Sequence, residues 1–250
     1  ATPAPGRGDG DARFPRAADR LQAALILGDE DGAAVATDEL LANAVNRAAL
    51  VSTRRQLLRL TAALGRGAAL ARRLEPAPAL HFTGHMLAAP GQPGRFPAAA
   101  EAAVAADIAA ALERIAPAAG FGSLASGGDI LVAEALLRRG ADLTIVLPFD
   151  RADFIQTSVA PAGPGWIERF EAVLARAGNL VQATEGPYLG DAEVFAYCTK
   201  LAMGLARLRA AIEQGTCHQL AVWDGQAGNG VAYLRDWNFA PAFAMVQTKV

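Results

Sequence analysis

The stretch Gly120–Asp150, GFGSLASGGDILVAEALLRRGADLTIVLPFD, decides the fold of this chain. It begins with a short apolar run, Phe121–Ala125, of the kind that forms a buried strand. A Ser-Gly-Gly turn follows at Ser126–Gly128, and Asp129 stands where a helix N-cap is expected, ahead of apolar residues at helical spacing. The β-rich apolar run Leu143–Leu147 comes next. This order of strand, turn, helix and strand predicts one unit of a parallel α/β sheet.

The same alternation continues on both sides of that unit. Further strands are predicted at Leu80–Leu87, Asn179–Thr184 and Gln219–Val222, and further helices after Pro97, after Trp166, over Asp191–Glu213 and over Val231–Trp237. Asp150–Gly165 is expected to be a long loop, and Ala240–Val250 has no clear period. Five strands that alternate with helices predict an α/β fold with a doubly wound, mainly parallel, Rossmann-like sheet.

The chain before the first strand has a different pattern. Residues 1–16 are rich in Gly, Pro and charge, which predicts a flexible leader. Residues 17–78 predict a helical appendage that packs on the sheet domain without adding a strand to it, with helices at Ala17–Leu27, Thr37–Val45 and Val51–Leu64. The sheet domain is then expected to cover residues 79–250.

Composition narrows the class of protein. A net charge of −2 and a pI near 6.0 argue against binding of nucleic acid across the surface. With 52% hydrophobic and 19% charged residues, the chain can build its core without disulfides. We expect Cys198 and Cys217 to be reduced thiols in a cytoplasmic protein, because their spacing fits no metal site. No apolar run is long enough to span a bilayer.

The N-terminus has neither an initiator Met nor the apolar core of a signal peptide. We therefore expect a piece of a longer protein. The three histidines and two cysteines are dispersed along the chain, so we expect no metal, no disulfide and no cofactor other than a nucleotide-like ligand.

The unit that opens this section resembles a known superfamily. Leu124–Asp129, LASGGD, together with Thr144–Leu147, is similar to the bacterial DNA-processing protein A. It is also similar to the wider SLOG superfamily of Rossmann-like domains, which bind nucleotides and nucleotide-derived ligands. The LONELY GUY phosphoribohydrolases, which activate cytokinins, belong to that superfamily. The resemblance implies nucleotide binding for this chain.

Further stretches resemble a narrower group within the superfamily. These are Thr83–Met86 with Arg95–Pro97, Trp223–Gly225, and Ser52–Leu57, which is similar to the closing helix of a tetratricopeptide region. Bacteria place the domain of this group after tetratricopeptide-type helices, sometimes in chains with a nucleotide cyclase domain. The resemblance covers about Ser52 to Trp237 and implies a role in signalling. It also implies the strand order 3-2-1-4-5, with a ligand crevice between the first and fourth strands.

Eight residues follow predicted strands and are expected to line that crevice, because the loops after parallel strands emerge at one edge of the sheet: Gly84, His85, Arg95, Ser126, Gly127, Gly128, Asp129 and Asp224. The turn would offer free backbone N–H groups to an anion. Asp129 suits a ribose hydroxyl, and Arg95 suits a phosphate. His85 suits a base or a phosphate.

Each of these residues also has a structural interpretation. The glycines could only make a tight turn, Asp129 could only cap the helix, and His85 and Arg95 could be ordinary residues of the surface. Asp224 could be a turn residue, because the Gly-Thr pair that usually follows its motif in the superfamily reads Gly228–Val231, GNGV, here. His81 and His218, at strand starts, are expected to be structural.

Three functions compete. The first is a sensory or regulatory domain that binds a nucleotide or nucleotide-derived small molecule and reaches a protein partner or output domain through the N-terminal helices. The second is an enzyme that cleaves or transfers an N-glycosidic bond, for which Asp129 and Glu134 are the acids expected near the crevice. The chain lacks the Pro-Gly-Gly-x-Gly-Thr run of the phosphoribohydrolases, so no catalytic residue is assigned. The third is a helical interaction module with an inert sheet domain.

Overall fold

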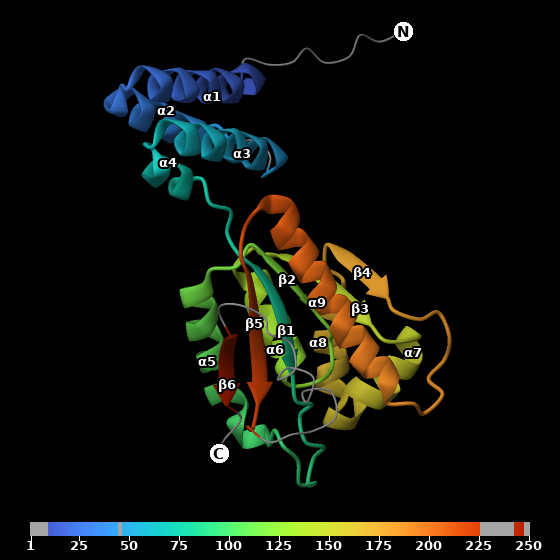
Figure 1. The fold of residues 1–250 in the computed structure, drawn as a ribbon. Coiled ribbons are helices and arrows are strands. Elements are labelled where there is room, and N and C mark those ends of the chain that lie inside the picture. Colours follow the sequence, from blue (N-terminus) through green and yellow to red (C-terminus); the bar gives the residue numbers. More distant parts are fainter. Residues whose placement is uncertain (1–9, 45–46, 226–242, 248–250) are drawn as a thin grey trace. The chain divides into compact units, whose positions relative to one another are not determined.

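A computed structural model of the chain describes residues 10–44, 47–225 and 243–247 (Figure 1). The chain divides into two compact units, Ala1–Pro76 and Ala77–Val250. Each unit has a buried apolar core of its own. Among the described residues, no helix is long and apolar enough to cross a membrane.

The first unit is helical throughout the part that is described. Its helices are α1 (Gly10–Leu27), α2 (Glu30–Ala42), α3 (Arg47–Leu64) and α4 (Ala68–Arg73). Gly28 has a φ of +79° and separates α1 from α2, and the Asp29 carboxylate caps α2 by accepting a hydrogen bond from the Gly32 N–H. Leu21, Leu40 and Leu57 bring the helices together around a core that is shielded from solvent.

Two expectations for this unit need correction. The expected leader extends to residue 16, whereas α1 already begins at Gly10. The reason is Phe14, which is buried and stands at helical spacing from Ala18 and Leu21 in the same core. The Gly and Pro content of the stretch obscured this apolar stripe. The short helix α4 was not predicted.

The second unit contains the sheet. Its strands are β1 (Ala79–Gly84), β2 (Ala119–Gly122), β3 (Asp142–Leu147), β4 (Asn179–Gln182), β5 (Cys217–Trp223) and β6 (Phe243–Gln247). They lie in the order β4-β3-β2-β1-β5-β6, and every neighbouring pair is parallel. The prediction of a doubly wound, parallel α/β sheet with N-terminal helices is confirmed.

The strand order and the strand count differ from the prediction. The expected order 3-2-1-4-5 is wrong, because β4 pairs with β3 at the edge of the sheet and β5 pairs with β1. The sequence of β4, NLVQ, is half polar, and the strand is mostly exposed, as an edge strand can be. The sixth strand, β6, lies in Ala240–Val250, for which no element was predicted.

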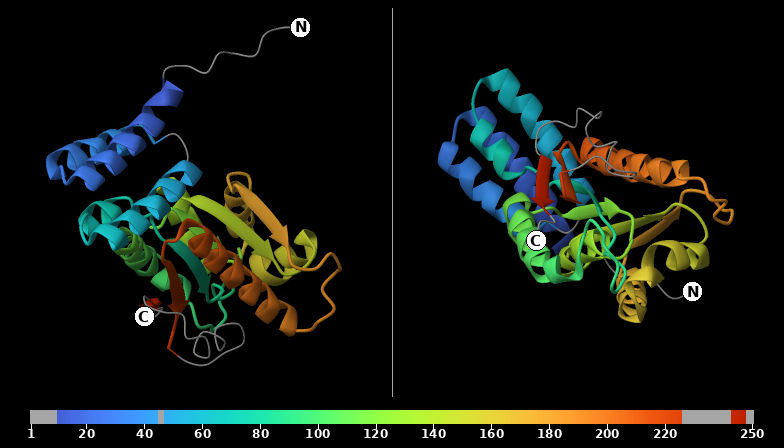
Figure 2. Two further views of the ribbon diagram at one scale, coloured as in Figure 1. Left: turned by 45° about the horizontal axis from the view of Figure 1, so that its top comes forward. Right: turned by 90° about the horizontal axis from the view of Figure 1, so that it is seen from below.

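Helices cover both faces of the sheet. Three helices on one face connect β1 to β2, β2 to β3 and β3 to β4: α5 (Glu101–Ile115), α6 (Gly128–Arg138) and α8 (Pro164–Leu174). Each of these crossovers moves the chain one strand outward from β1. The 21-residue helix α9 (Glu193–Glu213) then carries the chain back across the other face, over β3, β2 and β1, to β5. Figure 2 shows the sheet between these two layers.

The segment predicted as the long loop Asp150–Gly165 is helical instead. It contains α7 (Arg151–Phe154), the π-helical turn Ile155–Val159 and the 3₁₀ turn Ala160–Ala162. Asp150 caps α7 by accepting a hydrogen bond of 2.8 Å from the Ala152 N–H. The 3₁₀ turn Ala98–Ala100 likewise leads into α5. The helix predicted at Val231–Trp237 lies outside the described residues.

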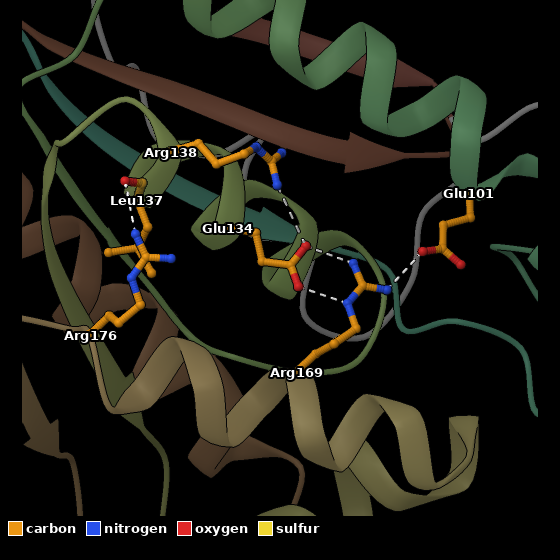
Figure 3. Close-up of polar contacts among 6 residues, drawn as sticks. All are labelled: Glu101, Glu134, Leu137, Arg138, Arg169 and Arg176. Atoms are coloured by element: carbon orange, nitrogen blue, oxygen red, sulfur yellow. Dashed lines mark hydrogen bonds and ion pairs between the residues drawn. The ribbon is translucent and has the colours of Figure 1, made fainter.

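An ion-pair cluster joins the three helices on the α5, α6 and α8 face (Figure 3). The Arg169 guanidinium donates two hydrogen bonds of 2.7 Å to the Glu134 carboxylate and one of 2.7 Å to Glu101. It also lies 4.0 Å from the centre of the Trp166 ring. Arg169 is half-buried and links α8 to α6 and α5.

Candidate functional site

The direction in which the strands are added reverses between β1 and β5. From β1 the chain adds β2, β3 and β4 on one side, and α9 then returns it to β5 on the other side. The residue pair Gly84 and Val222 joins β1 and β5 in register at their carboxyl ends. Parallel sheets bind ligands at such a reversal, outside the carboxyl ends of the strands. The reversal expected between the first and fourth strands therefore lies between β1 and β5 instead.

A cavity of about 660 Å³ opens at this edge of the sheet. That volume lies within the range of small-molecule sites. The cavity is lined by the ends of β1 and β2, by the first turn of α6, by α7 with the π-helical turn, and by the beginning of α9. The lining residues are Thr83, Gly84, His85, Met86, Arg95, Ser123, Ala125, Asp129, Phe154, Thr157, Ser158, Tyr188, Ala192, Phe195, Cys198 and Thr199.

Three charged or polar residues meet at the mouth of this cavity. His85 follows β1 and Asp224 follows β5, and their side chains lie 3.2 Å apart, between Nε2 and Oδ1. The Arg95 Nε lies 3.7 Å from the other oxygen of the same carboxylate. Burial lowers the pKa of His85, and the nearby Asp224 only partly opposes that shift. His85 is therefore neutral near pH 7 and bridges the ends of β1 and β5.

Asp129 lies at the inner end of the cavity and is only 4% exposed. Its Oδ2 accepts a hydrogen bond of 3.2 Å from the Ala125 N–H, while Oδ1 has no hydrogen-bond partner among the described residues. Burial raises the pKa of Asp129 to about 7, against the opposing effect of backbone N–H groups at Ala125 and Gly84. The helix begins at Gly128, so Asp129 stands in its first turn and is not the N-cap.

The turn before α6 offers fewer free N–H groups than were expected for an anion, because several of them already donate to backbone carbonyls. The N–H of Ser126 donates to the Ser158 carbonyl at 2.9 Å, that of Gly128 to His85 at 3.0 Å, and that of Ile130 to Ala125 at 3.3 Å. The carboxylate of Asp129 occupies the remaining positive field of the helix N-terminus. The sequence showed the turn but not the carbonyl groups that pair with it.

The three glycines of the predicted site serve close packing. A Cβ atom at Gly84 would lie 2.7 Å from the Gly128 Cα, and one at Gly128 would lie 2.8 Å from the Gly84 Cα. Gly127 has a φ of +90°, and its Cβ would lie 2.6 Å from the Leu87 nitrogen. The end of β1 therefore rests directly on the first turn of α6, and Gly127 also forms a backbone bridge with Met86.

Of the eight predicted residues, Gly84, His85, Arg95 and Asp129 line the cavity, and Asp224 holds two of them at its mouth. Ser126, Gly127 and Gly128 lie behind the lining, in the packed turn. The Ser126 hydroxyl is buried and has no partner within the described part of the chain. The acid Glu134, expected near the crevice, points instead to Arg169 on the α8 side (Figure 3).

Aromatic side chains form one wall of the cavity and were not predicted as part of the site. Phe154, Tyr188 and Phe195 line it, and Tyr188 stacks on the buried Phe149 with 4.6 Å between ring centres. The Phe195 ring meets Tyr188 edge-on at 5.6 Å. The Tyr188 N–H donates a hydrogen bond of 2.9 Å to Asp153, which fixes the loop before α9 to α7.

Sequence periodicity gave a misleading signal for this wall. Aromatic residues at helical spacing are typical of core packing, and Trp166 and Phe170 are indeed buried in the core. Phe195 and Tyr197 belong to such a pattern too, yet Phe195 is half-buried against the cavity and Tyr197 is 51% exposed. Cys198 and Thr199 lie inside α9, and Tyr188 lies in the loop between β4 and α9, so none of them directly follows or precedes a predicted strand. Strand-end logic therefore could not find them.

Of the other histidines and cysteines, Cys198 lines the cavity, and His81, His218 and Cys217 do not. His81 is buried, which lowers its pKa to about 3, and its Nδ1 lies 3.0 Å from the Gln219 amide. Burial raises the pKa of the Cys198 thiol to about 12, and that of Cys217 to about 11. Both thiols are free. Within the described ranges, no cluster of three His, Cys, Asp or Glu side chains could hold a metal ion.

The first unit holds a smaller cavity of about 250 Å³, lined by residues of α1, α2 and α4 and by Arg66. Arg66 donates hydrogen bonds to the carbonyls of Leu25 and Ile26, and thereby caps the end of α1. This guanidinium is a structural cap, so the cavity at the sheet edge is the stronger candidate for a ligand site.

Comparison of the chain with protein-family models, with curated proteins and with solved structures found no match. The case for function therefore rests on the geometry of the cavity at the carboxyl ends of β1 and β2.

Proposed function

We propose that the second unit binds a nucleotide or nucleotide-derived small molecule in the cavity at the carboxyl ends of β1 and β2, as a sensory or regulatory domain. The observation that carries the proposal is that two kinds of group line the same cavity. Tyr188 and Phe195 form an aromatic wall, and Asp129 contributes a buried carboxyl group with one oxygen that has no hydrogen-bond partner among the described residues. A nucleobase can stack on the aromatic wall, and a ribose hydroxyl can donate to the carboxyl. Arg95, at the mouth, can meet a phosphate.

The resemblance of the LASGGD stretch to SLOG domains supports the same class of ligand. In this proposal the glycines of that stretch contribute by letting β1 and α6 approach closely, which brings His85 and Asp129 to one cavity. The N-terminal helices would pass the bound state on to a protein partner or an output domain.

A panel of nucleosides and nucleotides tests the proposal by differential scanning fluorimetry and calorimetric titration. The blocking variant is Ala192→Trp, because Ala192 lines the cavity and is exposed, so a large ring fits there without disturbing the core. The matched control is Ala211→Trp, at an exposed position of α9 outside the cavity lining.

We expect at least one compound to bind the wild-type protein and the control equally, and to bind Ala192→Trp at least tenfold more weakly. Binding that survives Ala192→Trp unchanged would place the ligand elsewhere. If no compound of the panel binds, the proposal fails.

Asp129 also favours a second function, cleavage of an N-glycosidic bond. A buried carboxyl with a pKa of about 7 can act as an acid or a base near neutral pH, and Asp129 lines the cavity. Chromatographic detection of free base released from nucleoside monophosphates would test this. Steady release by the wild-type protein that is lost in Asp129→Asn would favour the enzyme, and no release would reject it.

A further inference from the structure

The cavity provides little positive charge. Among the described residues that line it, Arg95 is the one side chain with a permanent positive charge. The Arg95 Nε lies 3.7 Å from the Asp224 carboxylate, whose side chain is only 19% exposed, so much of that charge is already balanced. His85 shares the same carboxylate. A ligand with several phosphates would bring more negative charge than this site can neutralise.

The helix N-terminus at the cavity is a poor anion site. The N–H groups of Gly128 and Ile130 already donate to backbone carbonyls. The Asp129 carboxyl stands in the first turn of α6, where it would repel a phosphate whenever it is ionised. These features disfavour a phosphate at the usual position in a doubly wound sheet, the N-terminus of such a helix.

Asp129 instead creates a need for a hydrogen-bond donor. Its Oδ1 is buried and has no partner among the described residues, although the residue lines the cavity. An unsatisfied buried oxygen costs free energy, and a ligand that supplies a hydroxyl or amino hydrogen would recover it. The hydroxyls of Ser123 and Thr199 line the same cavity and extend its polar part.

From these observations, and resting on the proposed function, we infer that the ligand carries no more than one anionic group, close to Arg95, and donates a hydrogen bond to Asp129. Nucleosides, nucleoside monophosphates and cyclic mononucleotides meet this description. Nucleoside diphosphates and triphosphates do not. The site thus selects against the abundant triphosphates, which is what a sensor of a monophosphate or cyclic nucleotide requires.

Calorimetric titration at fixed ionic strength and pH 8, without divalent cations, tests the inference. The ligands are adenosine, AMP, 3′,5′-cyclic AMP, ADP and ATP, together with the same series built on guanosine, cytidine and uridine. We expect one series to bind, with the triphosphate at least tenfold weaker than the monophosphate, the cyclic nucleotide or the nucleoside.

The variant Asp129→Asn keeps an acceptor for the Ala125 N–H but places an amide donor where Oδ1 was. We expect it to weaken binding of the same compound about tenfold or more. The control is Asp142→Asn, the same substitution at an exposed position at the opposite, amino end of β3. It should leave the affinity unchanged.

The outcomes separate this inference from the proposed function. A triphosphate that binds as tightly as its monophosphate, or more tightly, overturns the charge limit while nucleotide binding stands. Unchanged affinity in Asp129→Asn overturns the role of that carboxyl as acceptor. If none of the compounds binds the wild-type protein, both the proposed function and this inference fail.

Discussion

At the scale of single residues, Asp129 is the group whose environment differs most from what its sequence position suggested. It was predicted as a helix cap that faces a ligand, and it lies in the cavity lining, but it is buried and one of its oxygens has no partner in the described part of the chain. Its pKa of about 7 lies above the ordinary value of 3.8, so the folded state holds the proton more tightly than the unfolded state. The stability that this proton gives is complete below about pH 4 and is lost as the pH rises to about 7.

The variant Asp129→Asn removes this titration and keeps the shape of the side chain. We therefore expect the free energy of unfolding of the variant, relative to that of the wild-type protein, to increase as the pH rises from 4 to 7. Above pH 7 the difference between the two proteins should stay constant. The gain should be about 1.4 kcal/mol for each unit by which the pKa is raised, or a few kcal/mol in total. Urea unfolding at pH 4, 5.5, 7 and 8 measures it. A difference that shrinks with rising pH would contradict the burial of an ionisable Asp129.

Gly128 gives a second prediction at this scale. A methyl group there would meet the Gly84 Cα at 2.8 Å and the Val222 Cβ at 2.9 Å, so β1 and α6 would have to move apart. We expect Gly128→Ala to lower the free energy of unfolding by about 1–3 kcal/mol.

Gly204→Ala is the matched control, because Gly204 lies in α9 with open space around it. It should be neutral or raise stability by up to about 1 kcal/mol. Equal effects of the two substitutions in urea unfolding would show that Gly84 and Gly128 do not pack as described.

At the scale of elements, sequence patterns predicted most of the helices and strands that are specified by residues within or directly beside them. The β2–α6–β3 unit follows from its apolar runs and its glycine turn, because each signal lies within a few residues of the element that it specifies. The ends of strands were predicted less accurately. β1 stops at Gly84, three residues before the predicted Leu87, because the chain turns there and Met86 forms a backbone bridge with Gly127. The helical segment after β3 was missed, since its turns of three kinds share no single period.

The cluster around Arg169 makes a prediction at this scale. Its guanidinium binds Glu134 with two hydrogen bonds and Glu101 with a third, a geometry that a lysine ammonium cannot reproduce (Figure 3). The side chain is 29% exposed, which limits the benefit of the ion pairs through solvent screening. We expect Arg169→Lys to lower the free energy of unfolding by about 1–2 kcal/mol.

Arg138→Lys serves as the control, because Arg138 contacts the same Glu134 at 4.0 Å from a largely exposed position. Thermal and urea unfolding should show a change within about 0.5 kcal/mol for this variant. A loss as large as that of Arg169→Lys would mean that charge alone, and not the paired geometry, holds α8 to α6.

At the scale of the whole molecule, the sheet topology places the candidate site, and the sequence could not supply that topology. Alternating strands and helices predict a parallel sheet, but not on which side of β1 the later strands lie. The long helix α9 settles this in the structure by returning the chain past β1 to β5. The same helix brings Phe195, Cys198 and Thr199 to the cavity from a segment remote from the LASGGD turn.

The central claim is that the cavity at the carboxyl ends of β1 and β2 binds a nucleotide-like ligand. The most direct measurement is a two-dimensional ¹H–¹⁵N correlation spectrum of the labelled protein, recorded during titration with nucleoside monophosphates and cyclic mononucleotides. We predict that the largest shift changes fall on the amides of Thr83–Met86, Ser123–Ala125 and Phe195–Thr199, which belong to the lining from three elements. Changes that gather instead in α1–α4, or at the opposite sheet edge around Ala119, Asp142 and Asn179, would contradict the account.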